Sequence, residues 1–375
     1  MKLPSVKDLP VKGKRVLLRT NYDVPLKKVQ SSKFKVQSWV VEDETRIEES
    51  LETIKWLLEN GAKVIAVSHL GRPEGRKVPE FSLEPVAEFL SSKFKVPACP
   101  AGRQNSKLQF KIKNFLGFKI TDNFVLLENI RFWSKEEENN LDFAKELASL
   151  ADFYVNEAFA CSHRKHASIV GVPKFFPSQN RAFGFDFLKE IEVLSRIREK
   201  PERPVVLLLG GTKEDKIAYA KKLVYWADWI LVGGKLVEHD DIPQIAKHPK
   251  ILADLLKSGQ DITMEAVKKF KEIIFKAKTI VWAGPMGNFY DKRYERGTKE
   301  IAQAVAESGA FSVVGGGDTE VALTRFGLDK KINFISSGGG AMLEFLAEGT
   351  LPGIEAIKSS NVRKSNVQNK SKTKN

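Results

Sequence analysis

The sequence predicts an α/β protein built from two doubly wound domains with parallel sheets. Short runs of β-branched and aliphatic residues alternate with helical segments, a pattern typical of a parallel sheet covered by helices on both faces. About nine such runs are too many for one typical sheet, and 375 residues suffice for about two domains. The predicted strands are Arg15–Arg19, Lys63–Ser68, Phe124–Leu127, Phe153–Val155, Val205–Leu209, Trp229–Val232, Thr279–Trp282, Phe311–Val314 and Asn333–Ile335.

Helical segments separate these strands. They are predicted at Asp43–Asn60, Leu83–Lys93, Leu141–Ala151, Met264–Ala277, Lys299–Ser308 and Glu320–Phe326. We place the domain change near Gly184–Pro204, after a loop rich in Pro, Phe and Gly and a charged helix. We therefore expect a first domain over residues 1–183 and a second over 184–357. The segment Lys27–Val41 is predicted as a hairpin or surface loop, and residues 358–375, rich in Ser, Asn and Lys, as a disordered basic tail.

Composition excludes several classes of protein. Hydrophobic residues make up 42% and charged residues 29% of the chain, an ordinary globular balance. Two cysteines, Cys99 and Cys161, make no disulfide framework and suit a reducing cytosol. Residues 1–10 lack the apolar core of a secretory signal, and no apolar run approaches the roughly 20 residues of a membrane span. We expect a cytoplasmic location, and Cys161 is interpreted as a buried structural cysteine rather than a nucleophile.

The formal net charge of +14 raises the hypothesis of nucleic-acid binding. The stretch Ser359–Asn375 carries five basic residues and no acidic one, and without it the net charge would be +9. The tail could give weak, salt-sensitive nucleic-acid binding, but no nucleic-acid motif is visible, so no specific nucleic-acid partner is expected. An anionic substrate would explain the remaining excess.

Cationic side chains gather at the predicted carboxyl ends of the first-half strands, where open parallel sheets bind ligands. One guanidinium group can donate two parallel hydrogen bonds to the two oxygens of a carboxylate or to two oxygens of a phosphate. Together these residues predict a cationic cup for a small polyanion. Arg46, behind the acidic run Glu42–Glu44, also has the simpler interpretation of a local ion pair. The cup would comprise Arg19, Asn21, His69, Arg72, Arg131, Asn156, His163, Arg164 and His166.

Glycine clusters follow the second-half strands and predict backbone cradles for phosphates. Lys213 and Lys216 follow the first cluster as point charges, although the Walker A spacing is absent. Asp318, at the start of a predicted helix, is a candidate Mg²⁺ ligand or, more simply, a helix cap. The clusters are Gly210–Gly211, Gly233–Gly234, Gly284, Gly287, Gly315–Gly317 and Gly338–Gly340, the last of which could steady a transferred group.

Eight ordered motifs between about Val11 and Ile357 resemble those of phosphoglycerate kinases. They are R-T-N-Y-D-V-P-L from Arg19, S-H-L-G-R-P from Ser68, L-L-E-N-I-R-F from Leu126, N-E-A-F-A-C-S-H-R-K-H-A-S from Asn156, G-G-T-K-E-D-K from Gly210, W-A-G-P-M-G from Trp282, G-G-G-D-T from Gly315 and S-S-G-G-G-A from Ser336. The resemblance implies two Rossmann-like lobes joined by a hinge, with the last segment returning to the first lobe. It also implies a glycolytic, monomeric enzyme that transfers a phosphoryl group from 1,3-bisphosphoglycerate to MgADP.

The resemblance assigns site residues to both lobes. The catalytic set would be Arg46, Lys213, Gly338, Gly339 and Gly340. The 3-phosphoglycerate or 1,3-bisphosphoglycerate site would comprise Arg19, Asn21, Asp23, Arg46, His69, Arg72, Arg131, His163, Arg164 and His166. The ADP or ATP site would comprise Gly211, Thr212, Lys213, Lys216, Gly233, Gly234, Gly284, Pro285, Asp291, Gly315, Gly316, Gly317, Asp318 and Thr319, with Mg²⁺ held by Asp318.

Several positions depart from the family pattern, mostly on the nucleotide side. Asn21 and Asp23 are exchanged relative to the usual first motif, and the interval between Lys213 and Lys216 is one residue shorter. Ala283 replaces an asparagine, and Tyr290, followed by Asp291, replaces an acidic residue. The segment 234–263 is also short, with Asp261-Ile262-Thr263 in place of D-x-G-P. These departures leave open a homologue with weakened activity or changed nucleotide preference.

Overall fold

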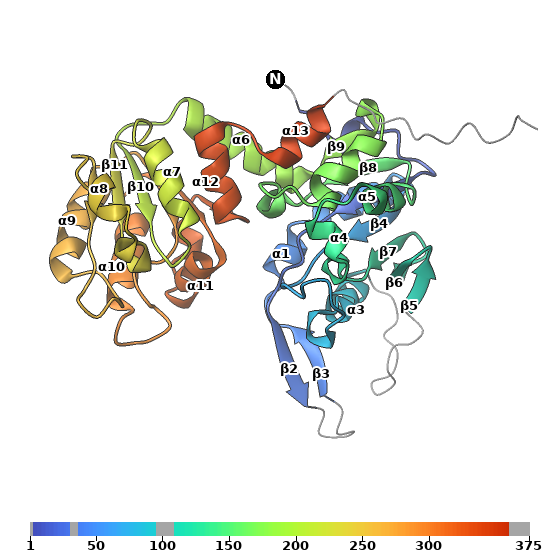
Figure 1. Ribbon diagram of the computed structural model, residues 1–375, viewed down its shortest axis with the longest axis horizontal. Helices are drawn as coiled ribbons and strands as arrows, with labels where there is room; N and C mark the ends of the chain where they lie inside the picture. The colour runs from blue at the N-terminus through green and yellow to red at the C-terminus, as the bar shows by residue number, and fades with distance from the viewer. Residues whose placement is uncertain (1–2, 31–36, 95–108, 360–375) are drawn as a thin grey trace, which may run out of the picture. The chain divides into compact units, whose positions relative to one another are not determined.

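The computed structural model describes residues 3–30, 37–94 and 109–359, and the chain divides into two compact units (Figure 1). Unit 1 comprises Met1–Lys189 together with the segment from Pro352 onward, and unit 2 comprises Glu190–Leu351. The division falls inside helix α6 (Phe185–Glu199). The last described helix, α13 (Pro352–Lys358), therefore belongs with unit 1 although it follows unit 2 in the chain.

In the described part of the chain, unit 1 is built on a seven-stranded sheet with the order β5-β6-β7-β4-β1-β8-β9. Its strands are β1 (Arg15–Arg19), β4 (Lys63–Val67), β5 (Gln109–Ile112), β6 (Phe115–Thr121), β7 (Phe124–Leu127), β8 (Phe153–Asn156) and β9 (Arg181–Phe183). The pairs from β7 to β9 are all parallel, whereas β5 and β6 are antiparallel. Strands β5 and β6 extend the predicted parallel sheet as an antiparallel hairpin, which needs no crossover helix.

The unit 1 strands are hydrophobic on both faces because both faces are covered. In β1, residues Val16–Arg19 are all buried. One face packs on α2 and α3 through Ile54, Leu57 and Leu90. The helices are α1 (Thr45–Glu48), α2 (Leu51–Glu59), α3 (Glu84–Lys93), α4 (Ser134–Glu137), α5 (Leu141–Ala148) and α13, with one π-turn, η5 (Ala167–Gly171). The short 3₁₀ turns are η1 (Val6–Asp8), η2 (Pro79–Phe81), η3 (Ile130–Phe132), η4 (Phe159–Cys161), η6 (Val172–Phe175) and η7 (Ser178–Asn180).

Three expectations for unit 1 have clear outcomes. The segment 27–41 contains the predicted hairpin, with β2 (Leu26–Gln30) antiparallel to β3 (Gln37–Val41). The single helix predicted over 43–60 is wrong, because α1 ends at Glu48 and α2 begins at Leu51. Ser50 lies between them and donates its hydroxyl to the Ile47 carbonyl oxygen at 2.9 Å. The tail predicted from residue 358 begins too early, because α13 includes Lys358; residues 360–375 lie outside the described chain.

Unit 2 contains a six-stranded, wholly parallel sheet in the described residues, with the order β12-β11-β10-β13-β14-β15. The strands are β10 (Val205–Leu209), β11 (Trp229–Val232), β12 (Ile251–Ala253), β13 (Thr279–Ala283), β14 (Phe311–Gly315) and β15 (Phe334–Ser336). The helices are α7 (Asp215–Leu223), α8 (Ile242–Ile245), α9 (Met264–Ile274), α10 (Arg296–Glu307), α11 (Gly317–Arg325) and α12 (Gly339–Glu348), with 3₁₀ turns η8 (Gly234–Glu238) and η9 (Asp329–Lys331).

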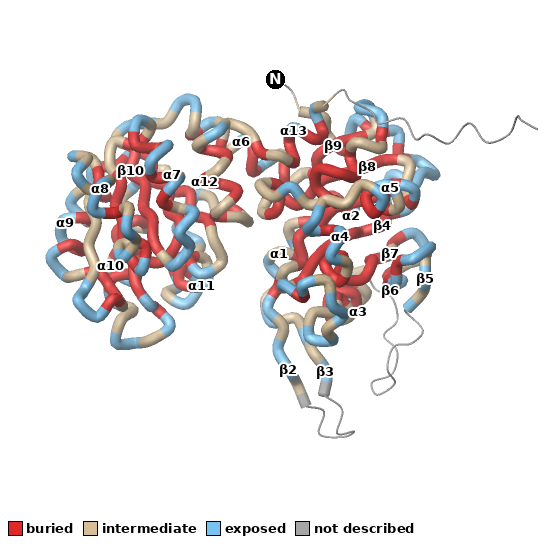
Figure 2. Tube along the Cα trace, viewed as in Figure 1, coloured by how far each residue is buried: buried red, intermediate tan, exposed pale blue. Residues whose placement is uncertain are grey.

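The unit 2 core lies between this sheet and its helices. Phe270 of α9 and Ile301 of α10 pack with Trp282 of β13 on one side. Helix α12 packs beside α7 and against β13 and β14. Figure 2 shows burial concentrated along the strands of each unit, with exposed residues on the outer turns of the helices. No helix in the described ranges has both the length and the apolar character needed to cross a membrane.

Candidate functional site

The sheet order of unit 1 reverses between β1 and β8. Its parallel strands lie in the order β7-β4-β1-β8-β9, which is 3-2-1-4-5 when they are numbered along the chain. The chain therefore adds strands on one side of β1 first and on the other side afterwards. Ligands of open α/β sheets bind at the carboxyl ends of the strands that flank such a switch point. Arg19 ends β1 and Asn156 ends β8, directly opposite each other in the register. The predicted cationic cup therefore starts at the switch point of its sheet.

Arg19 is a buried member of this cup, 1% exposed. Its guanidinium donates to the Thr20 carbonyl oxygen and, at 2.7 Å, to the Ser168 hydroxyl. Ser168 in turn donates from its hydroxyl (2.6 Å) and its backbone N–H (2.9 Å) to the buried carboxylate of Glu136. Burial raises the pKa of Glu136, and Arg19 opposes that shift. Arg19 is thus fixed from within the fold, with Glu136 partly compensating its charge.

Arg131 is 2% exposed and incompletely satisfied. It donates to the Gly71 carbonyl oxygen at 2.7 Å, and its Nε lies 3.4 Å from Glu137 Oε1. Its Nη2 has no hydrogen-bond partner within the described chain. Burial lowers the pKa of Arg131, and the neighbouring Arg164 lowers it further. A buried donor and charge without full compensation are costly, and an anion would satisfy both.

Two histidines line the same region in their neutral form. His69 is 3% exposed, and its Nδ1 lies 3.4 Å from Arg19 Nη2. Burial and the charge of Arg131 hold the pKa of His69 well below its usual range. The same causes lower the pKa of His166 to about 3. Neutral imidazoles leave the arginines as the cationic groups and can still donate hydrogen bonds to an anion.

Asp23 contacts both the turn that follows β4 and helix α1. Its Oδ1 accepts from the Gly71 N–H at 2.8 Å, and its Oδ2 lies 3.9 Å from Arg46 Nη1. Arg46 also donates to the Asp23 carbonyl oxygen. The half-buried Arg46 is therefore held beside the turn that carries His69 and Arg72, and Arg72 itself is exposed.

The remaining cup residues lie around this centre. Asn21 is buried, and the Cys161 thiol lies 3.7 Å from Asn21 Oδ1. Cys161 is buried, as predicted. The Nε of Arg164 lies 3.5 Å from His163 Nε2, and both residues are partly exposed. Unit 1 thus brings together the predicted cationic residues at the ends of neighbouring strands.

Unit 2 has its own switch point, between β10 and β13, because its strands run 3-2-1-4-5-6 along the chain. Lys216, in the first turn of α7, donates to the carbonyl oxygens of Gly210 (2.7 Å) and Ala283 (3.2 Å). Gly210 directly follows β10, and Ala283 is the last residue of β13. Burial lowers the pKa of Lys216 to about 8. A cation is thereby fixed at the point where this sheet order favours a ligand. Lys213 and Thr212, on the preceding loop, are exposed.

The predicted glycine cradles also serve close packing of the backbone. A Cβ on Gly284 would lie 2.1 Å from the Gly210 carbonyl oxygen, and Gly284 has φ +97°. A Cβ on Gly339 would lie 2.8 Å from the Gly315 carbonyl oxygen. Several glycines are therefore required where neighbouring loops touch. Gly316 differs: with φ +108° and an open surround it leads into the first turn of α11.

The chain was compared with known proteins. A family model described as phosphoglycerate kinase matches residues 6–239 and 237–349. The chain belongs to the phosphoglycerate kinase family. A phosphoglycerate kinase from Finegoldia magna is 39% identical over 416 residues, covering 95% of this chain and 99% of the relative. One from Dictyoglomus turgidum is 38% identical, covering 94% and 97% respectively.

Solved structures of phosphoglycerate kinases share the fold. That of Pyrococcus horikoshii superimposes with a TM-score of 0.75 at 28% identity, covering 95% of this chain and 98% of the other. That of Coxiella burnetii gives a TM-score of 0.73 at 31% identity, covering 95% and 99%. The two Rossmann-like α/β units predicted from the sequence are confirmed by these structures and by the strand orders described above.

Asp318 is the residue that the sequence predicts as a Mg²⁺ ligand. Asp318 is exposed at the first turn of α11, next to Thr319, whose hydroxyl accepts from the Gly284 N–H at 2.8 Å. The described residues contain no cluster of three or more His, Cys, Asp or Glu side chains suited to a metal. Mg²⁺ is commonly held by one or two carboxylates plus substrate phosphates, and Asp318 fits that arrangement.

Sequence reasoning missed partners that lie far away in the chain. Glu136 and Ser168, which fix Arg19, are 32 residues apart and carried no motif signal. Glu190 was also missed. Its carboxylate accepts from the N–H (2.6 Å) and the hydroxyl (2.8 Å) of Ser337, the residue directly before the last glycine cluster. Asp291, predicted to bind the nucleotide, is paired with Arg293 at 2.6 Å, which holds the pKa of Asp291 down to about 2.

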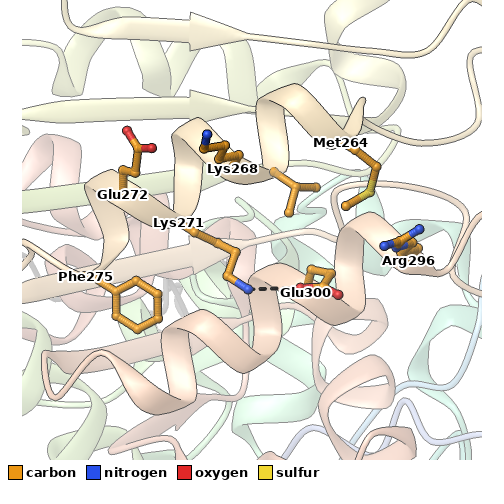
Figure 3. A pocket seen from close by; sticks show the side chains of 8 residues that line it. Met264, Lys268, Lys271, Glu272, Phe275, Arg296 and Glu300 are labelled. Carbon is orange, nitrogen blue, oxygen red and sulfur yellow. Dashed lines mark hydrogen bonds and ion pairs between the residues drawn. The ribbon is translucent and has the colours of Figure 1, made fainter.

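A separate hollow of about 400 Å³ lies between α9 and α10 (Figure 3). Its walls include Met264, Lys268, Phe275 and Arg296, and the Lys271 ammonium points to Glu300 at 3.0 Å. None of the predicted site residues lines it. The predicted site residues lie near the strand ends of the two units instead.

Proposed function

We propose that this chain catalyses reversible phosphoryl transfer from 1,3-bisphosphoglycerate to MgADP, giving 3-phosphoglycerate and MgATP in glycolysis. The observation that supports the proposal beyond family membership is the buried, incompletely satisfied guanidinium of Arg131, on the turn that follows β7 in unit 1. It lies among further arginines and neutral histidines, and a phosphorylated carboxylate supplies the acceptors that these donors lack. The comparisons give no support to a weakened or altered homologue.

On the phosphoglycerate side, the buried cations would provide the main charge. Arg131 and Arg164 would bind anionic oxygens, and His69 and His166 would donate hydrogen bonds. Asp23 would orient Arg46 and the 69–72 turn through the contacts described above. Arg19 and Asn21, both buried, would support this surface, and Arg72 and His163 would contact the ligand from its rim.

On the nucleotide side, Lys216 would place a cation at the ends of β10 and β13. Lys213 would approach the transferred group, and the backbone N–H groups at the start of α11 and α12 would receive phosphate oxygens. Asp318 would hold the magnesium ion, which supplies charge neutralisation between the phosphates. The remaining predicted contacts are Gly211, Thr212, Gly233, Gly234, Gly284, Pro285, Asp291, Gly315, Gly316, Gly317 and Thr319.

The chemistry requires positioning and charge stabilisation rather than a covalent nucleophile. Arg46, Lys213 and the N–H groups of Gly338–Gly340 would stabilise the negative charge on the phosphoryl group during in-line transfer. The donor and acceptor must meet with water excluded, and the hinge bending implied by the family resemblance would serve that step. We place the enzyme in the cytoplasm as a monomer, in keeping with its few cysteines.

The test is ADP-dependent ATP formation in a coupled assay. Wild-type protein should turn over, and Arg46→Ala or Lys213→Ala should lower kcat about 10²–10³-fold, the usual loss for one group that stabilises a transition state. Arg76→Ala and Lys269→Ala are matched controls, because both residues are exposed and paired only with nearby acids in the described chain. Absence of turnover in folded wild-type protein would refute the proposed function. Unchanged turnover in folded Arg46 or Lys213 variants would remove their assigned roles.

A further inference from the structure

Tyr290 is an exposed aromatic residue that contacts the candidate metal ligand. Its ring is on the loop between β13 and α10, and 62% of the residue is exposed. The phenol donates to Asp318 Oδ1 at 3.2 Å. A phenol ordinarily keeps its proton at neutral pH, so the hydroxyl can donate to the carboxylate.

The loop that carries Tyr290 is fastened along helix α11 at both ends. At one end the Gly284 N–H donates to the Thr319 hydroxyl at 2.8 Å. At the other, Arg325 in the last turn of α11 donates to the Phe289 carbonyl oxygen at 2.8 Å and to Glu295 at 2.9 Å. Phe289 itself is 1% exposed. The backbone next to Tyr290 is thus anchored, although the Tyr290 side chain is exposed.

The Tyr290 ring is also held by its neighbour. The rings of Phe289 and Tyr290 lie with centroids 4.2 Å apart and planes inclined by 33°. A buried ring beneath an exposed one restricts the directions in which the exposed hydroxyl can point. Without such a contact, an exposed aspartate such as Asp318 moves among staggered rotamers, and ligand binding has to fix one of them at an entropic cost. A hydrogen-bond donor held at one carboxylate oxygen reduces the number of rotamers before the ligand binds.

We propose that Tyr290 is a positioning residue for Asp318, whose hydroxyl holds the carboxylate in the orientation that meets the magnesium nucleotide. This inference rests on the proposed function, because it assumes that Asp318 serves the magnesium–nucleotide complex. Tyr290 acts through Asp318, so its contribution is confined to the magnesium-dependent part of nucleotide binding. One net hydrogen bond corresponds to about 2- to 10-fold in affinity.

The experiment measures ADP affinity by calorimetry, once with excess Mg²⁺ and once with EDTA. Tyr290→Phe keeps the ring and its contact with Phe289 but removes the hydroxyl. We expect it to weaken ADP binding about 2- to 10-fold with Mg²⁺ and to leave binding in EDTA unchanged. Tyr225→Phe is the matched control, because Tyr225 is 84% exposed in the same unit and should change neither affinity. Equal weakening in both conditions, or none in either, would overturn the proposal.

Asp318→Asn separates this inference from the function beneath it. If Asp318→Asn leaves the magnesium-dependent gain in ADP affinity intact, the assigned metal role fails, and the inference about Tyr290 fails with it. If Asp318→Asn abolishes the gain but Tyr290→Phe does not reduce it, the inference alone fails. The double variant completes a cycle: we expect Tyr290→Phe to have no further effect once Asp318 is replaced. Additive effects would show that Tyr290 acts independently of Asp318.

Discussion

Lys216 and Ala283 join the two central strands of unit 2, because the Lys216 ammonium donates to the Ala283 carbonyl oxygen at 3.2 Å. The same ammonium donates to Gly210 at 2.7 Å, at the end of the neighbouring strand. A side chain that bonds to the backbone of both strands has a fixed position. Its charge is therefore presented at one place, and the depressed pKa of about 8 makes that charge sensitive to mildly alkaline pH.

The first prediction concerns the pH dependence of nucleotide binding. Because the pKa of Lys216 is lowered to about 8, its charge is present below that pH and is lost above it. ADP affinity should therefore fall as the pH rises from about 7 to about 9. Lys216→Met should bind ADP about 10- to 100-fold more weakly at neutral pH, the value of a charge-assisted hydrogen bond, and show little further decline.

Calorimetric titration across this pH range checks the prediction. Lys222→Met is the control, because Lys222 is on the same helix, is exposed and pairs with Glu348. It should reproduce the wild-type pH profile. A decline of the same size in the Lys216 variant would show that another group titrates.

The second prediction concerns the contact between Gly284 and Gly210. Gly284→Ala would place its Cβ 2.1 Å from the Gly210 carbonyl oxygen at a φ of +97°, so we expect a loss of about 3 kcal/mol or more in unfolding free energy. Gly309→Ala shares a positive φ, +70°, but has nothing within 4 Å. It should cost only about 1–2 kcal/mol, for the left-handed backbone alone. Urea denaturation compares the two, and equal losses would mean that the contact is unimportant.

Strands that are buried on both faces could be predicted from the sequence, and exposed ones could not. Central strands such as β1 and β10 are covered on both faces and form continuous apolar runs, so the sequence predicts them within about one residue. The hairpin β5–β6 was missed because its outer strand alternates between exposed and half-buried residues and resembles a surface loop. The break at Ser50 was also missed. It depends on a side chain that bonds to the backbone and to the Tyr22 hydroxyl, 28 residues away.

For the candidate site, the sequence predicts residues near strand ends but not the partners that lie far away in the chain. The cationic side chains could be predicted to lie near one another because they end or follow strands β1, β4, β7 and β8, and sheet topology places the carboxyl ends of these strands together. The Glu136–Ser168 pair was not predicted, because its role depends on a contact between Ser168 and Arg19, which are 149 residues apart in the chain. The packing role of Gly339 could not be predicted for the same reason, since Gly339 begins α12 and its contact Gly315 ends the distant strand β14.

The third prediction concerns Glu157, which directly follows β8 and is buried against the first turn of α6. Its carboxyl accepts from the Thr53 hydroxyl at 2.5 Å and from the N–H groups of Asp186 and Phe187 at 3.3 Å. Burial raises the pKa of Glu157 to about 8 from an ordinary value of 4.5. Between these values the folded state keeps a proton that the unfolded state has lost, so acid favours folding and stability falls as the pH rises.

Glu157→Gln should therefore remove part of this pH slope. The difference in unfolding free energy between variant and wild type should shift in favour of the variant by at most about 1.4 kcal/mol per pH unit between about pH 5 and pH 8. Glu192→Gln, on α6, is the control, because Glu192 is exposed. Urea denaturation at several pH values measures the slope, and parallel pH curves for Glu157→Gln and wild type would contradict the expectation.

The fourth prediction concerns the buried guanidinium of Arg131. Replacing it with Met removes a desolvated charge whose Nη2 lacks a partner in the described chain, but also removes the hydrogen bond to the Gly71 carbonyl oxygen, so the ligand-free protein should lose at most about 1–3 kcal/mol of stability. Wild-type protein should gain about 2.7 kcal/mol at 3-phosphoglycerate concentrations 100 times its Kd, and Arg131→Met should gain far less. Thermal denaturation with and without the ligand measures both. A full gain in the variant would exclude Arg131 from the site, and Arg76→Met should behave as wild type.

The fifth prediction concerns proton uptake on anion binding. In the free protein, burial and the charge of Arg131 lower the pKa of His166 to about 3, so His166 stays neutral well below its ordinary pKa. A bound anion offsets the arginine charge and must raise that pKa. Binding should therefore take up protons below the ordinary histidine pKa of about 6.5, and the affinity should increase as the pH falls.

Sulfate is a suitable probe, because it stays fully ionised throughout this range and does not itself titrate. Its Kd should be lower at about pH 5.5 than at about pH 7.5, and heats measured in buffers of different ionisation enthalpy should reveal the bound proton. His166→Asn should reduce the proton uptake, whereas His248→Asn, in the other unit, should leave it unchanged. Because His69 is also buried beside Arg131, uptake that persists in His166→Asn but disappears in His69→Asn would assign the proton to His69. Uptake that survives both substitutions would show that neither imidazole responds to the anion.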